Sequence, residues 1–167
     1  SNASYFINYV IAQVSEKYGD DAIYKDGLKI YTTLDMDAQN AAVAAMQNLP
    51  NYYTDKNGLH QPQGAIVAMN PHNGYIVAMV GGRGDDSFNR ATQAERQPGS
   101  TMKPFVYLAA IQSGKTPGSI VDDSPVSFGS WSPKNYENDY EGKITYRYAL
   151  QHSRNVAAVK IADEVGM

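Results

Sequence analysis

The amino-acid sequence predicts an α+β fold, in which helices cover a small sheet. Residues 64–70 and 74–82 are apolar without polar alternation, and the short turn between them ends at the Gly that opens the second stretch. A sheet of two such strands should be covered on both faces, most simply by helices. Flanking segments carry apolar residues at helical spacing. With 167 residues, 43% of them hydrophobic, the chain is long enough for one core, as a domain or as part of a larger one.

Composition and charge weigh against several classes of function. The formal net charge is −3 and no basic cluster occurs, which argues against nucleic acid as the main partner. The chain has no cysteine, and His60, His72 and His152 share no ligand-like spacing. We therefore expect neither a metal site nor a cofactor. No apolar run is long enough to span a bilayer.

Local patterns predict the elements that precede the two strands. Residues 4–18 carry aromatic and aliphatic side chains at helical spacing, which predicts a helix. Residues 28–34 are rich in β-branched and aromatic side chains and alternate roughly, so we expect a strand there. Asp35 is then predicted to cap a helix that runs through Leu49.

A second helix is predicted after the strands. Pro98 and Gly99 indicate a turn, and the apolar run at 105–111 that follows predicts a helix. Because this run has little polar face, we expect the helix to be buried on nearly all sides. Ser100 would lie at or near its N-terminus, with Lys103 one turn further along the same face.

The last third of the chain begins with a long irregular segment at 116–142, which contains the single tryptophan, Trp131. Two interpretations have equal weight. The segment frames a cleft, as long irregular loops in compact domains often do, or it is an ordinary surface loop anchored by a buried Trp131. Short helices are predicted at 145–151 and 156–165.

The Ser100–Lys103 pair suits nucleophilic catalysis. A serine hydroxyl becomes a good nucleophile when a neighbouring base takes its proton, and a lysine is such a base only when burial or positive neighbours lower its pKa. Backbone N–H groups at a helix start would also stabilise developing negative charge. The alternative is a serine N-cap followed by an unrelated lysine, because so short a motif recurs by chance. Ser153 and Asn155 could likewise be N-cap residues only.

Taken together, several stretches resemble the penicillin-binding transpeptidases, specifically the class A (bifunctional) penicillin-binding proteins. Ser100 and Lys103 lie in a stretch similar to the first family motif, Ser-x-x-Lys, and Ser153 and Asn155 match the second, Ser-x-Asn. The resemblance extends over residues 31–35, 64–82, 88–92, 96–105 and 149–157. It implies the α+β penicillin-binding transpeptidase fold, which is similar to that of the serine β-lactamases.

The resemblance also implies a role for each site residue. Ser100 would attack the carbonyl of a D-Ala-D-Ala stem peptide, or of a β-lactam that mimics it, and its backbone N–H would help bind the oxyanion. Lys103 would accept the Ser100 proton. Ser153 would relay a proton toward the leaving group, and Asn155 would hydrogen-bond substrate and Lys103. An amine from a second stem peptide would then take the acyl group and cross-link the cell wall.

The domain organisation follows from the same resemblance. We expect a tag remnant at 1–3, an interdomain linker segment at 4–26 and the N-terminal part of a transpeptidase domain at 27–167. The third family motif, Lys-Thr-Gly, lies on a strand that lines the cleft, and it does not occur after Asn155. An earlier Lys-Thr pair, at 115–116, is followed by proline where the motif needs glycine. We therefore expect the C-terminal strands to be missing and the chain to be inactive alone.

The resemblance implies three partners: peptidoglycan stem peptides, β-lactams and an upstream glycosyltransferase domain. It also implies a place on the extracytoplasmic face of a bacterial membrane. An N-terminal transmembrane helix outside this chain would anchor the protein there. Removal of sheet strands would also expose an edge through which copies self-associate. One alternative is a non-catalytic β-lactam sensor or assembly scaffold of the same fold. Another is a D,D-carboxypeptidase or β-lactamase, since these enzymes share the first two motifs.

Overall fold

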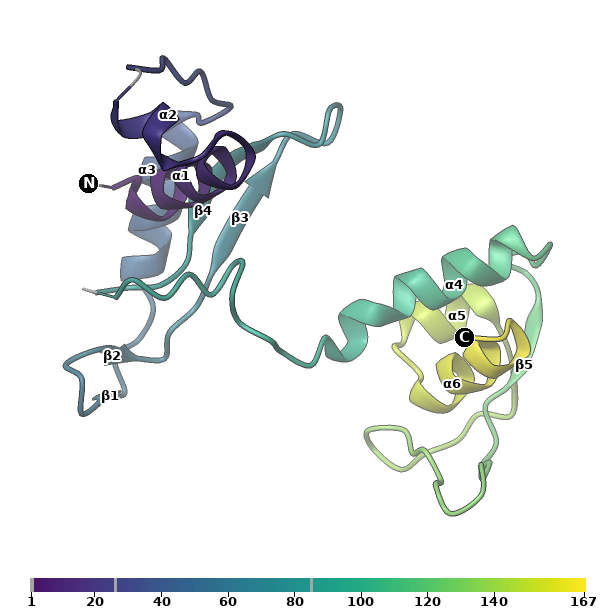
Figure 1. The fold of residues 1–167 in the computed structure, drawn as a ribbon. Coiled ribbons are helices and arrows are strands. Elements are labelled where there is room, and N and C mark those ends of the chain that lie inside the picture. Colours follow the sequence, from purple (N-terminus) through teal and green to yellow (C-terminus); the bar gives the residue numbers. More distant parts are fainter. Residues whose placement is uncertain (1, 26, 85) are drawn as a thin grey trace. The chain divides into compact units, whose positions relative to one another are not determined.

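The structure is a computed structural model that describes residues 2–25, 27–84 and 86–167. The chain forms two compact units, Ser1–Glu95 and Arg96–Met167 (Figure 1). Helices and small antiparallel sheets occur in both units, so the predicted α+β class is confirmed. Among the described residues, no helix is both long and apolar enough to cross a membrane.

The first unit contains α1 (Ser4–Tyr18), α2 (Asp20–Tyr24), α3 (Met36–Gln47), β1 (Tyr53–Thr54), β2 (His60–Gln61), β3 (Ile66–Met69) and β4 (Ile76–Val80). The second contains the 3-10 helix η1 (Gly99–Met102), α4 (Lys103–Gln112), β5 (Ile120–Asp122), β6 (Lys143–Thr145), α5 (Tyr146–Gln151) and α6 (Asn155–Glu164).

The predicted hairpin is formed by β3 and β4, which pair antiparallel with Ala68 opposite Ala78. One face packs against α3, where Ala42 and Met46 join Ala78 in a buried cluster. On the other face of β3, Val67 is 43% exposed and Met69 is 55% exposed. The expectation that helices cover both faces is therefore wrong for β3. An apolar strand sequence shows that a face can be buried, but it does not say which neighbour covers it.

Helix α3 begins where its cap was predicted. The Asp35 Oδ1 atom accepts hydrogen bonds from the backbone N–H groups of Asp37 and Ala38, at 2.9 and 3.1 Å. One turn later the fully buried Gln39 faces β4. Its Nε2 donates to the Met79 carbonyl at 3.0 Å, and its Oε1 accepts from the Met79 N–H at 2.8 Å. The side chain thus satisfies both backbone groups of one strand residue.

The strand predicted at 28–34 is not formed. Residues 27–34 form no regular secondary structure, and Ile30 and Tyr31 are exposed. In the described part of this segment and its junction with α3, a single backbone hydrogen bond reaches β4, from Asp35 N to the Val77 carbonyl at 2.9 Å. The side chains of this segment have high β propensity, but a strand also needs a partner along its whole length.

Helix α1 has the predicted bounds of 4–18, and Gly19 follows it with φ +82°. The helix packs against the hairpin rather than standing alone. Phe6 is buried, and Ala3, within the segment interpreted as a tag remnant, is also buried. Packing of this kind gives the helix its stability, because an isolated helix of this length is marginal in water.

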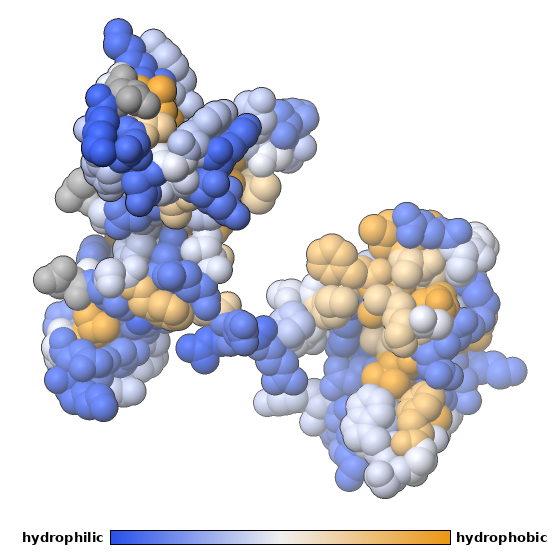
Figure 2. Space-filling model, viewed as in Figure 1, coloured by the Kyte–Doolittle hydropathy of each residue, from blue (hydrophilic) through white to orange (hydrophobic). Residues whose placement is uncertain are grey.

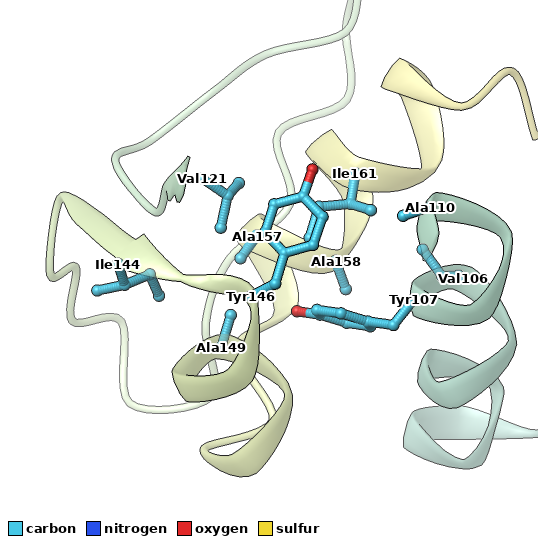
Figure 3. Close-up of a cluster of buried hydrophobic side chains, with 10 residues drawn as sticks. All are labelled: Val106, Tyr107, Ala110, Val121, Ile144, Tyr146, Ala149, Ala157, Ala158 and Ile161. Carbon is cyan, nitrogen blue, oxygen red and sulfur yellow. The ribbon is translucent and has the colours of Figure 1, made fainter. Parts of the chain in front are cut away.

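The second unit has its own core, which α4, α5, α6 and the two-stranded β5–β6 sheet surround (Figure 3). The Tyr107 ring of α4 meets the Tyr146 ring of α5 edge to face, with centroids 5.8 Å apart. The short helices predicted at 145–151 and 156–165 are present as α5 and α6. The buried members of this core are Val106, Tyr107, Ala110, Val121, Ile144, Tyr146, Ala149, Ala157, Ala158 and Ile161.

Helix α4 is buried on one side only, which corrects the expectation of nearly complete burial. Val106, Tyr107 and Ala110 face the core, whereas Phe105 and Leu108 are 61% and 53% exposed. Figure 2 shows hydrophobic residues on the surface over this helix. A uniformly apolar helix can be buried all round, but the number of faces that are covered depends on the neighbours that are present.

Candidate active site

Ser100 lies in η1, the 3-10 turn that leads directly into α4. Pro98 precedes the turn with φ −70°, and Gly99 adopts φ +57°, in the left-handed region that favours glycine. The turn continues into the α-helix at Lys103, so the two residues of the first motif are separated by about one helical turn. The predicted position of Ser100, close to the N-terminus of this helix, is confirmed.

The Lys103 side chain extends from the start of α4 to three oxygen atoms of Ser153 and Asn155. Its Nζ atom lies 2.6 Å from the Ser153 carbonyl oxygen, 2.9 Å from Ser153 Oγ and 2.6 Å from Asn155 Oδ1. Lys103 is 9% exposed, and its burial lowers the pKa of the ammonium group below the usual value. Burial therefore raises the fraction of Lys103 that is neutral at a given pH.

In all three contacts Lys103 Nζ is the donor. A protonated lysine has three N–H donors, and the Ser153 carbonyl, Ser153 Oγ and Asn155 Oδ1 accept one hydrogen each. A neutral Lys103 would keep two of these N–H donors and could turn its lone pair to Ser153 Oγ, whose hydroxyl would then donate. Lys103 must reach that neutral state before it can receive a proton from Ser153.

Ser153 links the lysine to the nucleophile. The Ser153 and Ser100 Oγ atoms are 3.1 Å apart. Among the described residues, no hydrogen bond joins Ser100 Oγ directly to Lys103 Nζ, so the connection runs through Ser153. Ser153 has φ +52°, a backbone conformation that is strained for any residue with a Cβ. The strained turn directs its hydroxyl between the two groups.

Asn155 begins α6 and is held at both ends of its side chain. Its Nδ2 donates to the Lys134 carbonyl at 3.0 Å, while its Oδ1 accepts from Lys103. The N-cap position of α6 is occupied by Arg154, whose side chain makes no cap hydrogen bond. The alternative interpretation of Ser153 and Asn155 as simple N-cap residues is therefore wrong. The structure brings together all four residues that the sequence singled out.

An open groove of about 670 Å³ lies beside these residues. Trp131 is 55% exposed and lines the groove together with Ser100 and Lys103. The interpretation of the irregular segment as a loop anchored by a buried tryptophan is therefore wrong, and the segment frames a cleft instead. In the parts of the chain that the structure describes, no group of three or more histidine and acidic side chains could hold a metal ion.

Sequence reasoning missed the residues that support the site from behind. Asp123 and Asn135 lie in the irregular segment, and Arg154 separates the two residues of the second motif. Each is buried. No periodicity or short motif links positions so far apart, and buried polar character is a property that only the folded chain reveals.

Comparisons with known proteins show the family to which this chain belongs. Residues 64–167 match the family described as the penicillin binding protein transpeptidase domain. Penicillin-binding protein 1A of Rickettsia conorii is 46% identical over 112 residues, which cover 62% of this chain and 14% of that protein. Penicillin-binding protein 1A of Neisseria gonorrhoeae is 46% identical over 114 residues, which cover 63% of this chain and 14% of that protein. This chain thus spans only a small part of the length of these relatives.

Solved structures show the same similarity. The penicillin-binding protein PonA1 from Mycobacterium tuberculosis superposes with a TM-score of 0.78 at 30% identity, over 95% of this chain and 40% of that one. PonA1 in complex with penicillin V gives a TM-score of 0.77 at 29% identity, over 95% and 41% of the two chains.

Proposed function

Because the chain belongs to the penicillin-binding protein transpeptidase family, we propose that it carries the nucleophilic centre of a peptidoglycan D,D-transpeptidase. The observation that supports this most directly is the continuous path from Ser100 Oγ through Ser153 Oγ to the buried Lys103 Nζ. Such a path gives a serine the base that it needs for attack on a carbonyl.

The proposed reaction follows from these contacts. Ser100 Oγ attacks the carbonyl of the D-Ala-D-Ala bond while its proton passes to Ser153 Oγ, and the Ser153 proton passes to Lys103 Nζ. Collapse of the tetrahedral intermediate breaks the peptide bond, and the leaving amine takes the proton back along the same path. An amine of a second stem peptide then attacks the Ser100 ester, which forms the cross-link and restores the serine.

A β-lactam would react at the same site, because attack on its strained amide also gives a Ser100 ester. The similarity to a protein whose structure contains penicillin V supports this part of the proposal. The mostly apolar groove beside Ser100, with Trp131 and Val159 in its walls, offers a binding surface for the body of the ligand.

The similarity to penicillin-binding proteins 1A supports a further proposal about the cellular setting. We propose that the protein acts with a glycosyltransferase domain and at the extracytoplasmic face of a bacterial membrane. Self-association through a sheet edge is also proposed. Its support is that, within the described parts of the chain, β3 pairs with β4 alone and has one free edge.

Labelled penicillin tests the central proposal. We expect the native full-length protein to form a covalent adduct that peptide mass spectrometry maps to Ser100. Ser100→Ala should abolish the adduct. Ser132→Ala, which removes another serine hydroxyl from the wall of the same groove, should leave it unchanged. A label on another serine would refute the assignment.

A cross-linking assay then separates the enzyme from a sensor. We expect the protein to join a stem-peptide donor ending in D-Ala-D-Ala to an acceptor amine, with loss of D-Ala, and Ser100→Ala to abolish the product. A protein that forms the penicillin adduct but neither transfers nor hydrolyses the donor would instead be a non-catalytic β-lactam sensor.

A further inference from the structure

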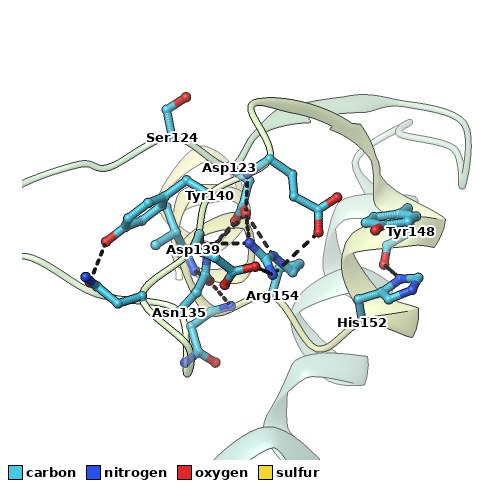
Figure 4. A network of polar contacts seen from close by, with 12 residues as sticks. Asp123, Ser124, Asn135, Asp139, Tyr140, Tyr148, His152 and Arg154 are labelled. Carbon is cyan, nitrogen blue, oxygen red and sulfur yellow. Dashed lines mark hydrogen bonds and ion pairs between the residues drawn. The ribbon is translucent and has the colours of Figure 1, made fainter.

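Figure 4 shows a network of polar contacts around Arg154, in which Asp123, Asn135 and Arg154 itself are buried. Asp123 is fully buried, and the Arg154 guanidinium binds its Oδ2 atom through Nε at 2.8 Å and Nη2 at 2.7 Å. Arg154 Nη1 also contacts Asp139 Oδ2 at 3.0 Å. The network therefore joins two points of the irregular segment to the middle residue of the second motif.

Asn135 connects this ion pair to helix α6. Its Nδ2 donates to both Asp123 carboxylate oxygens, at 3.1 and 3.0 Å, and to the Asp139 carbonyl at 2.9 Å. Its Oδ1 accepts from the backbone N–H groups of Asn155 and Val156, at 2.8 and 3.0 Å. These contacts determine which end of the amide faces which partner, and they make Asn135 the cap of α6 in place of a residue next to the helix.

The capped helix start carries the acceptors of Lys103. Asn155, whose N–H binds Asn135, presents Oδ1 to Lys103 Nζ. Arg154 is covalently joined to Ser153, whose carbonyl and hydroxyl are the other two acceptors. Displacement of Asn135 would therefore move all three acceptors relative to Lys103.

We propose that Asn135 is a positioning residue for the reaction. The Asp123–Arg154 pair holds Asn135, and Asn135 fixes the start of α6. The positions of Ser153 and Asn155 then keep Lys103 Nζ within hydrogen-bond distance of Ser153 Oγ. This inference rests on the proposed function and assigns Asn135 no contact with substrate. A buried ion pair is weak support for stability but can specify one arrangement of a site. The backbone of Ser153 is strained, and a strained conformation persists only where the surrounding contacts hold it in place.

The test measures acylation by labelled penicillin in the native full-length protein, with the rate constant at saturation separated from the half-saturating concentration. Asn135→Ala should lower the saturating rate constant by about 100-fold, the order expected for a displacement of about 1 Å at reacting groups. The half-saturating concentration should change less than about threefold, because no groove contact is removed. Arg154→Lys, which keeps the charge but not the planar fork, should lower the rate constant by about tenfold.

Ile161→Val is the matched control. Ile161 is fully buried in the same helix but lies outside the network, so it reports the effect of a destabilised core alone. Its acylation rate constant should stay within about twofold of wild type at a temperature where it is folded.

Each outcome decides the question. If Asn135→Ala is folded and acylates at the wild-type rate, Asn135 has no positioning role. If Asn135→Ala does not fold, Arg154→Lys decides in the same way. If Ile161→Val lost as much acylation rate as Asn135→Ala, the loss would come from lower stability alone, and the inference would be overturned. Failure of the wild-type protein to form the Ser100 adduct would overturn the proposed function, and this inference with it.

Discussion

Replacement of Ser153 by alanine or glycine should separate catalysis from stability at one position. Both changes remove the hydroxyl that connects Ser100 Oγ, 3.1 Å away, to Lys103 Nζ, 2.9 Å away. Both leave the backbone carbonyl of residue 153 and Asn155 Oδ1 in place to hold the lysine. Acylation should fall by about 10²–10⁴ in each variant, the range usual for loss of a positioned proton-transfer group.

Stability should respond differently. Ser153 has φ +52°, and this conformation costs a residue with a Cβ about 1–2 kcal/mol. Glycine removes that strain, although its greater freedom in the unfolded chain returns about 0.5–1 kcal/mol of the gain. The glycine variant should therefore be more stable than the alanine variant by up to about 1.5 kcal/mol, or about 3–6 °C in Tm for a protein of 150–250 residues.

The measurements are the acylation rate with labelled penicillin and the midpoint of thermal unfolding, made on the same preparations. Acylation of either variant within about tenfold of wild type would show that the proton of Ser100 does not pass through Ser153. A glycine variant less stable than the alanine variant would show that the backbone at 153 is not strained.

Other predictions concern the lysine and the first unit. Lys103→Arg should lower acylation by at least about 10²-fold, because arginine stays protonated and cannot act as the base, and near-normal labelling would show that charge alone suffices. Since burial lowers the Lys103 pKa, the acylation rate of wild type should increase with pH through a pKa below 10.5, and a pH-independent rate would contradict a neutral lysine base. Gln39→Leu should lower the free energy of unfolding by about 2–4 kcal/mol, because both Met79 backbone groups lose their buried partner. Chemical denaturation measures both variants. Asn40→Leu, on the exposed side of the same helix, should change the free energy of unfolding little. An equal loss in Gln39→Leu and Asn40→Leu would refute the reasoning.

Local signals in the sequence were sufficient for most of the elements. Asp35 caps α3 as predicted because an N-cap depends on residues within one turn. The hairpin at β3 and β4 formed for a similar reason, since two apolar runs and a short turn define it. The positions of Ser100 and Lys103 at the start of α4 also follow from a local pattern, a Pro-Gly turn before an apolar run.

Features that depend on distant neighbours could not be predicted. The exposed side of α4 at Phe105, the exposure of Trp131 in the groove and the missing strand at 28–34 are all decided by what packs alongside. The support of the site by Asn135 is of the same kind, because its partner Asn155 is 20 residues away in sequence. The residue types at these positions do not show which distant residues they will contact.

The buried Gln39 has a consequence for the edge of the sheet. Met79 turns its backbone N–H and C=O to the side of β4 opposite β3, where another strand could pair. The Gln39 side chain accepts from that N–H and donates to that C=O, as the backbone of a neighbouring strand would. A strand from another chain would have to displace this buried amide, and a buried amide without partners costs about 1–3 kcal/mol. One side chain of α3 therefore blocks the outer edge of β4 at Met79.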